Sequence, residues 1–246
     1  MNAFLKHLLI QFKMDIREHG TLMTYYLVPL VFYLVMGAVF SSINPLAKQT
    51  LSATMVIFAV TMGAVLGIPA PIVKMRESGV LRAYRVCGIP GWAVLFIQAV
   101  SAFLHLLVVS IIIFITAHLF FGSSYPQSLI GYSLALFILL FSSIALGLFI
   151  GVMALSQSIA MMLSQAIFLP TMMFSGIMFP ASMLPKTLRV AGRLLPATYI
   201  MQSFSGLAFM LHTDIDATLS LLIAAGIGVV AASLTVARFR TMGKSV

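Results

Sequence analysis

Residues 129–155 read LIGYSLALFILLFSSIALGLFIGVMAL and contain no charged side chain. An α-helix rises about 1.5 Å per residue, so about 20 apolar residues cross the hydrocarbon core of a bilayer, which is about 30 Å thick. Hydrocarbon offers a peptide group no hydrogen-bond partner, and an α-helix satisfies its backbone internally. The stretch therefore predicts a membrane-spanning helix and indicates an all-α integral membrane protein.

Similar apolar runs lie on both sides of this stretch. The six predicted spans are Leu22–Phe40, Leu51–Val73, Trp92–Phe121, Leu129–Leu155, Ile159–Phe179 and Ala217–Ala237. Of the 246 residues, 61% are hydrophobic and 8% are charged, whereas roughly a quarter are charged in soluble domains. Such a composition leaves room for short loops only. We therefore treat residues 21–246 as one six-span membrane domain, preceded by a separate segment, residues 1–20.

The distribution of Lys and Arg predicts the orientation. On the side of the two termini lie Lys6, Lys13, Arg17, Lys74, Arg76, Arg82, Arg85, Arg238, Arg240 and Lys244, and on the other side lie Lys48, Lys186, Arg189 and Arg193. Short cytoplasmic connections are enriched in these residues, so ten against four predicts cytoplasmic termini in a cell (plasma or inner) membrane. Topology and membrane lipid explain the net charge of +9, and no nucleic acid partner is expected.

The first 20 residues have the pattern of an amphipathic helix. One arc of the helical wheel holds Phe4, Leu5, Leu8, Leu9, Phe12 and Ile16, and a neighbouring strip holds Lys6, Lys13 and Arg17. Asp15 falls inside the apolar arc and interrupts it. We favour a cytoplasmic helix lying in the membrane interface, followed by a turn at Gly20, over a merely solvated leader.

The most charged stretch, residues 74–90, reads KMRESGVLRAYRVCGIP. A short helix here would place Glu77, Leu81 and Tyr84 on one face, as a small docking surface. An ordinary positively charged loop explains the stretch equally well. Pro69 and Pro71 precede it and are expected to bend or end the second span, because each lacks a backbone donor.

The connection before the last span, residues 176–199, is interrupted several times. The interrupting residues are Gly176, Pro180, Pro185 and Pro196. We expect a re-entrant helical hairpin in the outer leaflet, because irregular backbone at that depth must be buried in protein or line a wet cavity. Its basic residues, Lys186, Arg189 and Arg193, are spaced to share one face of a short helix. Lipid phosphates are favoured over an anionic substrate as their partners.

Several kinds of chemistry lack the residues that they need. None of the five acidic residues falls well inside a predicted span, which argues against ion-coupled transport. Neither HExxH nor GxSxG occurs, so no catalytic or metal site is predicted. His105 and His118 are interpreted as hydrogen-bonding residues between or at the ends of helices. Cys87 is the only cysteine and can form no intramolecular disulfide.

Two further patterns bear on packing and on nucleotide binding. Pairs of glycines four residues apart, at 63 and 67 and at 147 and 151, permit close helix approach, more plausibly within one subunit than between two. Gly243-Lys244-Ser245 resembles the end of a phosphate loop, but Arg238 stands where the first glycine is required. The chain is therefore predicted to bind no nucleotide and no other cofactor.

Three features occur in an order typical of one family. They are the amphipathic N-terminal segment with six spans, RESGVL at residues 76–81, and FSGIMFP at 174–180 continuing through LP at 184–185 to LPATY at 195–199. Over nearly its whole length the chain resembles the permeases of type-2 ATP-binding-cassette exporters.

The resemblance implies a dimer with a second copy or a similar permease, and cytoplasmic ATPase subunits that bind the ATP and magnesium. The residues that it assigns to ATPase coupling are Arg76, Glu77, Gly79, Leu81, Arg82 and Tyr84, with Pro69 and Pro71 as hinge candidates. The few polar groups in the spans favour an apolar or amphipathic cargo, such as a drug, a lipid-linked molecule or a hydrophobic peptide. Polysaccharide carriers also occur in the family. The alternatives are a non-transporting subunit for self-protection or assembly and, less favoured, an intramembrane enzyme.

Overall fold

The computed structural model describes residues 3–43, 47–86, 88, 90–178 and 185–242, and its described residues form helices, turns and loops without a strand. Six helices are long and apolar enough to cross a membrane. They are His19–Ser42, Lys48–Glu77, Gly91–Phe121, Leu129–Met153, Gln157–Phe174 and Ala217–Phe239. The six predicted spans are therefore confirmed as helices, with ends that differ by a few residues.

Two of the six long helices contain a wider, π-helical turn. The first consists of α2 (His19–Leu22), the π-helical turn η1 (Met23–Leu27) and α3 (Val28–Ile43), and the second of α4 (Ala47–Met62), η2 (Gly63–Gly67) and α5 (Pro69–Glu77). The other four are α7 (Gly91–Phe121), α8 (Leu129–Met153), α9 (Gln157–Phe174) and α12 (Ala217–Met242). The short elements are α1 (Ala3–Arg17), α6 (Val80–Val86), α10 (Lys186–Gly192), α11 (Pro196–Ser203) and the π-helical η4 (Phe204–Ala208).

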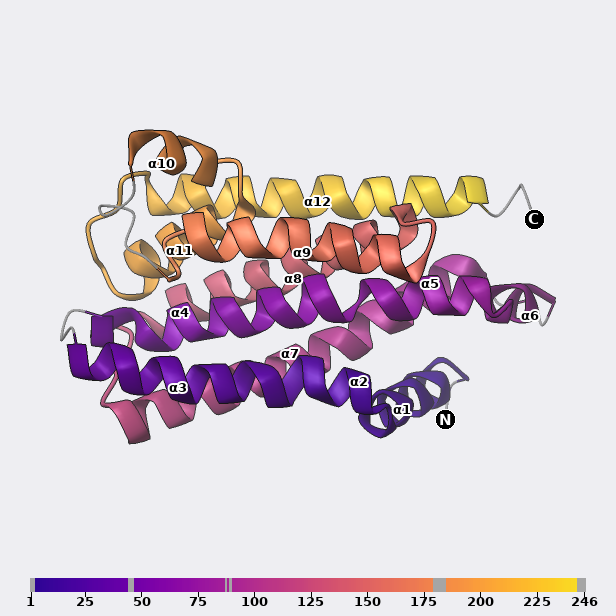
Figure 1. Cartoon of the computed structure of the whole chain (residues 1–246), viewed down its shortest axis with the longest axis horizontal. Coiled ribbons are helices and arrows are strands. Elements are labelled where there is room, and N and C mark those ends of the chain that lie inside the picture. Colours follow the sequence, from indigo (N-terminus) through magenta and orange to yellow (C-terminus); the bar gives the residue numbers. More distant parts are fainter. Residues whose placement is uncertain (1–2, 44–46, 87, 89, 179–184, 243–246) are drawn as a thin grey trace.

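The long helices lie side by side with the short ones at their ends (Figure 1). α1, α6 and the end of α12 lie at one end of the molecule, and α10 and α11 lie at the other (Figure 1). The beginning and the end of the described chain are therefore on the same side, as an even number of spans requires.

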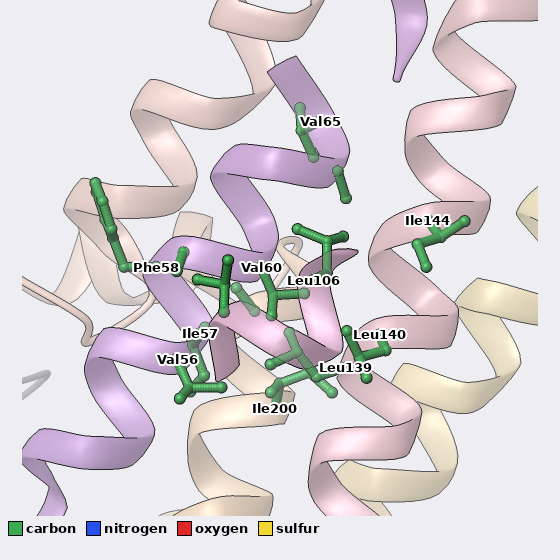
Figure 2. Packing of buried hydrophobic residues seen from close by; sticks show 14 of the residues in the cluster. Val56, Ile57, Phe58, Val60, Val65, Leu106, Leu139, Leu140, Ile144 and Ile200 are labelled. Carbon is green, nitrogen blue, oxygen red and sulfur yellow. The ribbon is translucent and has the colours of Figure 1, made fainter. Parts of the chain in front are cut away.

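The core is centred on α4, in which residues 51–60 are all buried. Figure 2 shows Val56, Ile57 and Val60 of this helix beside Leu106 of α7 and Leu139 of α8. Because α4 is covered by neighbouring helices, it has little surface left for lipid. The second span is thus the internal column of the subunit.

Two predicted boundaries are wrong. The chain turns into the first span at Glu18, whose backbone is extended, and Gly20 lies inside α2. The fifth helix ends at Phe174, five residues earlier than predicted, because Gly176 has a positive φ of 85° that an α-helix does not allow. Phe179 and Pro180 lie outside the described residues.

The prolines of the second span do not end it. Pro69 is the first residue of α5, and the helix continues to Glu77. The irregularity lies just before it, in η2 and at Ile68, whose N–H donates to the carbonyl of Ala64 at 3.4 Å. The second span therefore bends here and does not end. Of the two outcomes predicted from Pro69 and Pro71, a bend or an end, the first is the one that occurs.

α10 and α11 occupy the connection before α12. Pro196 opens α11, and Arg193 caps the end of α10 next to the predicted basic residues Lys186 and Arg189, which α10 contains. α11 continues into η4 and packs against α12, α8 and α4. Two short helices thus stand where a helical hairpin was predicted, and their depth in the membrane remains a prediction.

The paired glycines serve packing within this subunit. A Cβ atom on Gly147 of α8 would lie 2.2 Å from the carbonyl oxygen of Ala64 in η2, and one on Gly151 would lie 3.1 Å from the Cα atom of Pro69. Gly63 and Gly67 likewise face Tyr25 of the first span. The expectation that these glycines bring helices of one subunit together is therefore confirmed.

We expect Gly147→Ala to destabilise the protein by about 1–3 kcal/mol, because the added methyl group overlaps a backbone carbonyl that has little room to move. Gly226→Ala on α12 is the matched control, since no atom lies within 4 Å of its added Cβ. The helix propensity of alanine predicts a control that is as stable as the parent or slightly more stable. Unfolding in detergent, followed by circular dichroism, compares the two, and equal stability of both variants contradicts the packing assignment.

Candidate functional site

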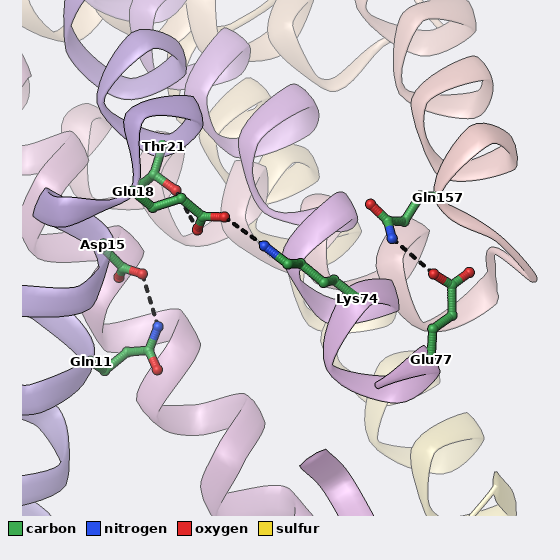
Figure 3. Close-up of polar contacts among 7 residues, drawn as sticks. All are labelled: Gln11, Asp15, Glu18, Thr21, Lys74, Glu77 and Gln157. Carbon is green, nitrogen blue, oxygen red and sulfur yellow. Dashed lines mark hydrogen bonds and ion pairs between the residues drawn. The ribbon is translucent and has the colours of Figure 1, made fainter. Parts of the chain in front are cut away.

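Four segments meet at the end of the molecule that holds α1. They are α1 with the Glu18 junction, the end of α5, α6, and the link between α8 and α9. The polar contacts that join most of them are drawn in Figure 3. This cluster contains every residue that the sequence assigned to ATPase coupling.

The end of the second span is bonded to the beginning of the fifth. The amide of Gln157, the first residue of α9, donates to Oε2 of Glu77 at 2.8 Å (Figure 3). The guanidinium of Arg76 donates to the carbonyl oxygen of Ala154, which caps the end of α8. Arg76 and Glu77 are the last two residues of α5, so the end of this helix is bonded to the end of α8 and to the start of α9.

The predicted face of Glu77, Leu81 and Tyr84 does not form. Glu77 ends α5, and the chain turns at Ser78 and Gly79 before α6 begins at Val80. Gly79 has a φ of 73°, in the left-handed region that favours glycine, so the reversal depends on this residue. The prediction of a single helix is wrong because it continued the helical period across Gly79, where the helix is interrupted.

α6 carries the other candidate coupling residues. Leu81 and Tyr84 are half-buried, whereas Val80 and Val86 are exposed, the latter to 84%. Arg82 belongs to α6, but its side chain lies outside the described part of the structure. The helix therefore presents apolar side chains on its outer surface beside the Gly79 turn.

α1 contacts α6 and α5 at separate points. Nε2 of His7 lies 3.2 Å from the hydroxyl of Tyr84, and the two ring centroids are 5.3 Å apart. Glu18, which follows the other end of α1, forms an ion pair with Lys74 of α5, in which Oε1 and Nζ are 3.0 Å apart (Figure 3). That pair is solvent-exposed and contributes at most about 1 kcal/mol. The pair shows that the α1–α2 junction lies close to α5.

A buried carboxylate that the sequence did not assign holds α1 to the third span. Asp15 is 6% exposed and accepts hydrogen bonds from Gln11 at 2.8 Å and from Ser101 of α7 at 2.5 Å. Burial raises the pKa of this carboxyl, the hydrogen bonds from Ser101 and Gln11 lower it in part, and Glu18 adds to the rise. The only sign in the sequence was an acid within the apolar arc of residues 4–16.

The residues at the opposite end form a separate group. On α10, Lys186 is exposed and Arg189 is half-buried, while Arg193 is exposed at the helix end. Gly192 lies so close to α9 that a Cβ atom there would be 2.3 Å from the carbonyl oxygen of Phe174. The basic residues therefore extend from a helix that is fixed against the fifth span.

An apolar cavity of about 550 Å³ lies between α7, α8 and α12. Its wall consists of Gly91, Trp92, Leu95, Phe96, Ala99, Val100, Phe103, Phe137, Phe141, Ile144, Ala145, Leu148, Ala232, Thr235, Val236 and Phe239. The hydroxyl of Thr235 donates to the carbonyl of Ala231 at 2.7 Å, so its hydrogen is not available to an occupant. The cavity can accommodate hydrocarbon or aromatic groups.

No group of three or more His, Cys, Asp or Glu side chains in the described ranges could hold a metal ion. In the polar contacts described above, Asp15, Glu77 and Glu18 are single carboxylates, each paired with hydroxyl, amide or ammonium groups. Their chemistry is that of helix-to-helix attachment.

Comparison with known families places these elements in context. A family model described as ABC-2 type transporter matches residues 8–209, from within α1 to just beyond η4, and so includes the first five spans. A comparison with curated proteins gave no match. The match covers most of the chain, and it confirms the resemblance that the motifs suggested. The chain belongs to the ABC-2 type transporter family and is a multi-pass membrane component of a transport system.

Proposed function

We propose that the chain is the membrane-spanning subunit of an ATP-driven exporter whose ATPase is a separate polypeptide. The observation that carries this proposal is the attachment of α5 and α6 to both α1 and the start of α9. The ATPase docks on α6 and the Gly79 turn, where Val80 and Val86 are exposed. ATP and magnesium are bound by that partner.

The geometry suits the transmission of force into the membrane. α6 joins α5 through a turn of two residues, and α5 continues through η2 into the buried α4. ATP-driven closure of the ATPases moves α6, and the bonds of Glu77 and Arg76 carry the displacement to α9. The second and fifth spans then shift between inward-open and outward-open arrangements. Pro69 and Pro71, with η2 beside them, act as the hinge.

The charge distribution supports an orientation with this end in the cytoplasm. α1, α5 and α6 hold seven of the 14 Lys and Arg residues, and the part of α12 that contains Arg238 lies at the same end of the molecule (Figure 1). Short basic segments are retained on the cytoplasmic side of a plasma or inner membrane. In this orientation α1 lies in the inner interface, with Leu9 and Ile16 exposed toward lipid. α10 and α11 form the outer re-entrant hairpin, and Lys186 and Arg193 face lipid phosphates.

A glutamine on α9 supports a second permease copy. Gln165 is exposed in the middle of this span, on a surface with Met161, Met162 and Leu169. An amide exposed to hydrocarbon is costly, whereas amides between helices form interhelical hydrogen bonds. The α9 surface is therefore covered by a second copy or by a similar permease.

The cavity supports an apolar or amphipathic cargo. It opens between spans, and Phe239 packs against Gly91 so closely that a Cβ atom on Gly91 would lie 2.5 Å from its ring. This contact stands at the first residue of α7, where that helix leaves the membrane. A hydrocarbon chain thus enters from the bilayer and not from the water at this end.

We expect Glu77→Lys to reduce substrate-stimulated ATPase activity and transport several-fold, because reversing the charge breaks the bond from Gln157 and separates the movement of α5 from that of α9. Membrane insertion remains intact, since Glu77 is exposed at a helix end. The measurement compares ATP hydrolysis and cargo uptake into inside-out vesicles by the reconstituted complex.

Glu77→Gln is the matched control, because its amide oxygen still accepts a hydrogen bond from Gln157, and it is expected to retain most of the activity. Co-purification with the ATPase is measured for both variants. Full transport by Glu77→Lys with normal ATPase binding argues against the coupling assignment.

Trp92, the only tryptophan in the sequence, lines the cavity and reports its occupancy. We expect phospholipid with brominated acyl chains to quench its fluorescence in two components, a saturable one from the cavity and a proportional one from bulk lipid at its exposed face. Ala145→Phe fills the cavity and removes the saturable component. Quenching that follows the mole fraction of brominated lipid in both proteins contradicts the cavity as a site for hydrocarbon chains.

A further inference from the structure

The contact between α1 and the third span is made by groups that exchange protons. Oδ2 of Asp15 accepts the hydrogen bond of Ser101 and lies 3.8 Å from Nε2 of His105 on the same helix. Asp15 and His105 are both buried, the latter completely. A carboxyl and an imidazole are thus enclosed together between two helices.

His105 is held firmly by its other contacts. Its Nδ1 lies 2.7 Å from the hydroxyl of Tyr26 in the first span, and its ring is stacked on Phe12 of α1 with centroids 4.2 Å apart and planes 4° apart. The ring of Tyr25, also in the first span, is stacked on the ring of His105 with centroids 5.6 Å apart. Two segments, α1 and the first span, therefore fix the ring that faces Asp15.

The contact is incomplete on the side of Asp15. Nε2 of His105 has no hydrogen-bond partner among the described residues, although it is buried. The distance of 3.8 Å exceeds that of a hydrogen bond, which is about 2.8–3.0 Å, by roughly 1 Å. A small movement of α1 toward α7 would bring these two atoms within hydrogen-bonding distance. A single proton between the carboxyl and the imidazole is then enough to form the hydrogen bond.

We propose that Asp15, Ser101 and His105 form a proton-controlled latch that holds α1 against the third span. The latch also positions α6, because α1 contacts it through His7 and Tyr84. This second role rests on the proposed function of α6, whereas the docking of α1 itself does not. Asp15 is a positioning residue, since it acts on the coupling region through the helix that carries it.

The charged and titratable groups around the latch are few. On α1, Lys13 and Arg17 are exposed, and Glu18 at its end is bonded to Lys74 of α5. The first span contributes the hydroxyl groups of Tyr25 and Tyr26, and α7 contributes His105. The groups around the Asp15 carboxyl are therefore Lys13 and Arg17 from α1, Glu18 just after it, Tyr25 and Tyr26 from the first span, Lys74 from α5 and His105 from α7. Of the two acids, Asp15 and Glu18, Asp15 is the buried one.

The direction of the pH effect follows from the environment of Asp15. Burial raises the pKa of the docked carboxyl above that of the same group when α1 is released into water. The docked state then binds the proton more tightly, so docking is strongest below the ordinary pKa of an aspartate. Docking weakens as the pH rises from that value to the raised pKa, and it is constant above it.

Docking is measured by the distance between two spin labels in the full-length protein in lipid nanodiscs. The labels are placed on Met14→Cys of α1 and Leu104→Cys of α7, both exposed, in a Cys87→Ser background that removes the native thiol. Double electron–electron resonance is recorded from about pH 4 to pH 8. We expect a single short distance in acid and a growing, longer and broader population as the pH rises.

Three variants separate a proton latch from a merely structural contact. Asp15→Asn keeps the hydrogen-bond acceptor but removes the titrating carboxyl, so it is expected to lose the strengthening of docking in acid. Ser101→Ala removes a hydrogen bond that lowers the pKa of Asp15, so the midpoint moves to higher pH. Glu18→Gln is the matched control, because it neutralises an exposed acid nearby and should retain the pH dependence.

The latch is overturned if Asp15→Asn keeps the pH dependence of the parent, or if Ser101→Ala leaves the midpoint unchanged. The distances are recorded without ATPase or cargo, so a failure of the latch is distinguishable from a failure of the proposed exporter function. Adding the ATPase then tests the second role: its affinity for the membrane subunit should follow the docked fraction, both in the parent and in Asp15→Asn.

Discussion

The structure depends on one constraint, which is that a peptide group in hydrocarbon must find its hydrogen-bond partner within the protein. The constraint turns each apolar run into a helix and confines irregular backbone to places that neighbouring helices cover. η2 illustrates this, since Gly147 of α8 lies directly against the carbonyl of Ala64. Buried polar side chains obey the same requirement: Asp15 enters the helix bundle only with Ser101 and Gln11 as donors.

The packing gives the spans different mechanical roles. α4 is enclosed by its neighbours and is continuous with α5, so the helix that ends at Glu77 leads to the centre of the subunit. α9 is more exposed, yet its first residue is bonded to that same glutamate. α1 reaches the spans through a buried carboxyl and reaches α6 through a histidine. The end of the molecule that holds α1 is therefore joined to the buried second span by attachments that are few and individually weak.

Sequence reasoning recovered what depends on composition and local period. The six spans, the packing glycines and the family follow from apolar length, from small residues four apart and from motif order. It failed where one residue changes the backbone: Gly79 divides the predicted docking helix, and Gly176 ends the fifth helix early. It also missed the pairing of Asp15 with His105, because two residues 90 positions apart meet only through the packing of α1 on α7. Asp15 interrupted an apolar pattern, and its partner could not be read from that interruption.

The π-helical turns η1 and η2 lie against each other, with Tyr25 of the first facing Gly63 and Gly67 of the second. Each such turn holds one residue more than an α-helical turn needs. Moving that residue along the helix advances everything between the old and new positions by about 1.5 Å and rotates it by about 100°. Such a step would keep every backbone hydrogen bond inside the protein, which is the condition that hydrocarbon imposes on any rearrangement of the first two spans.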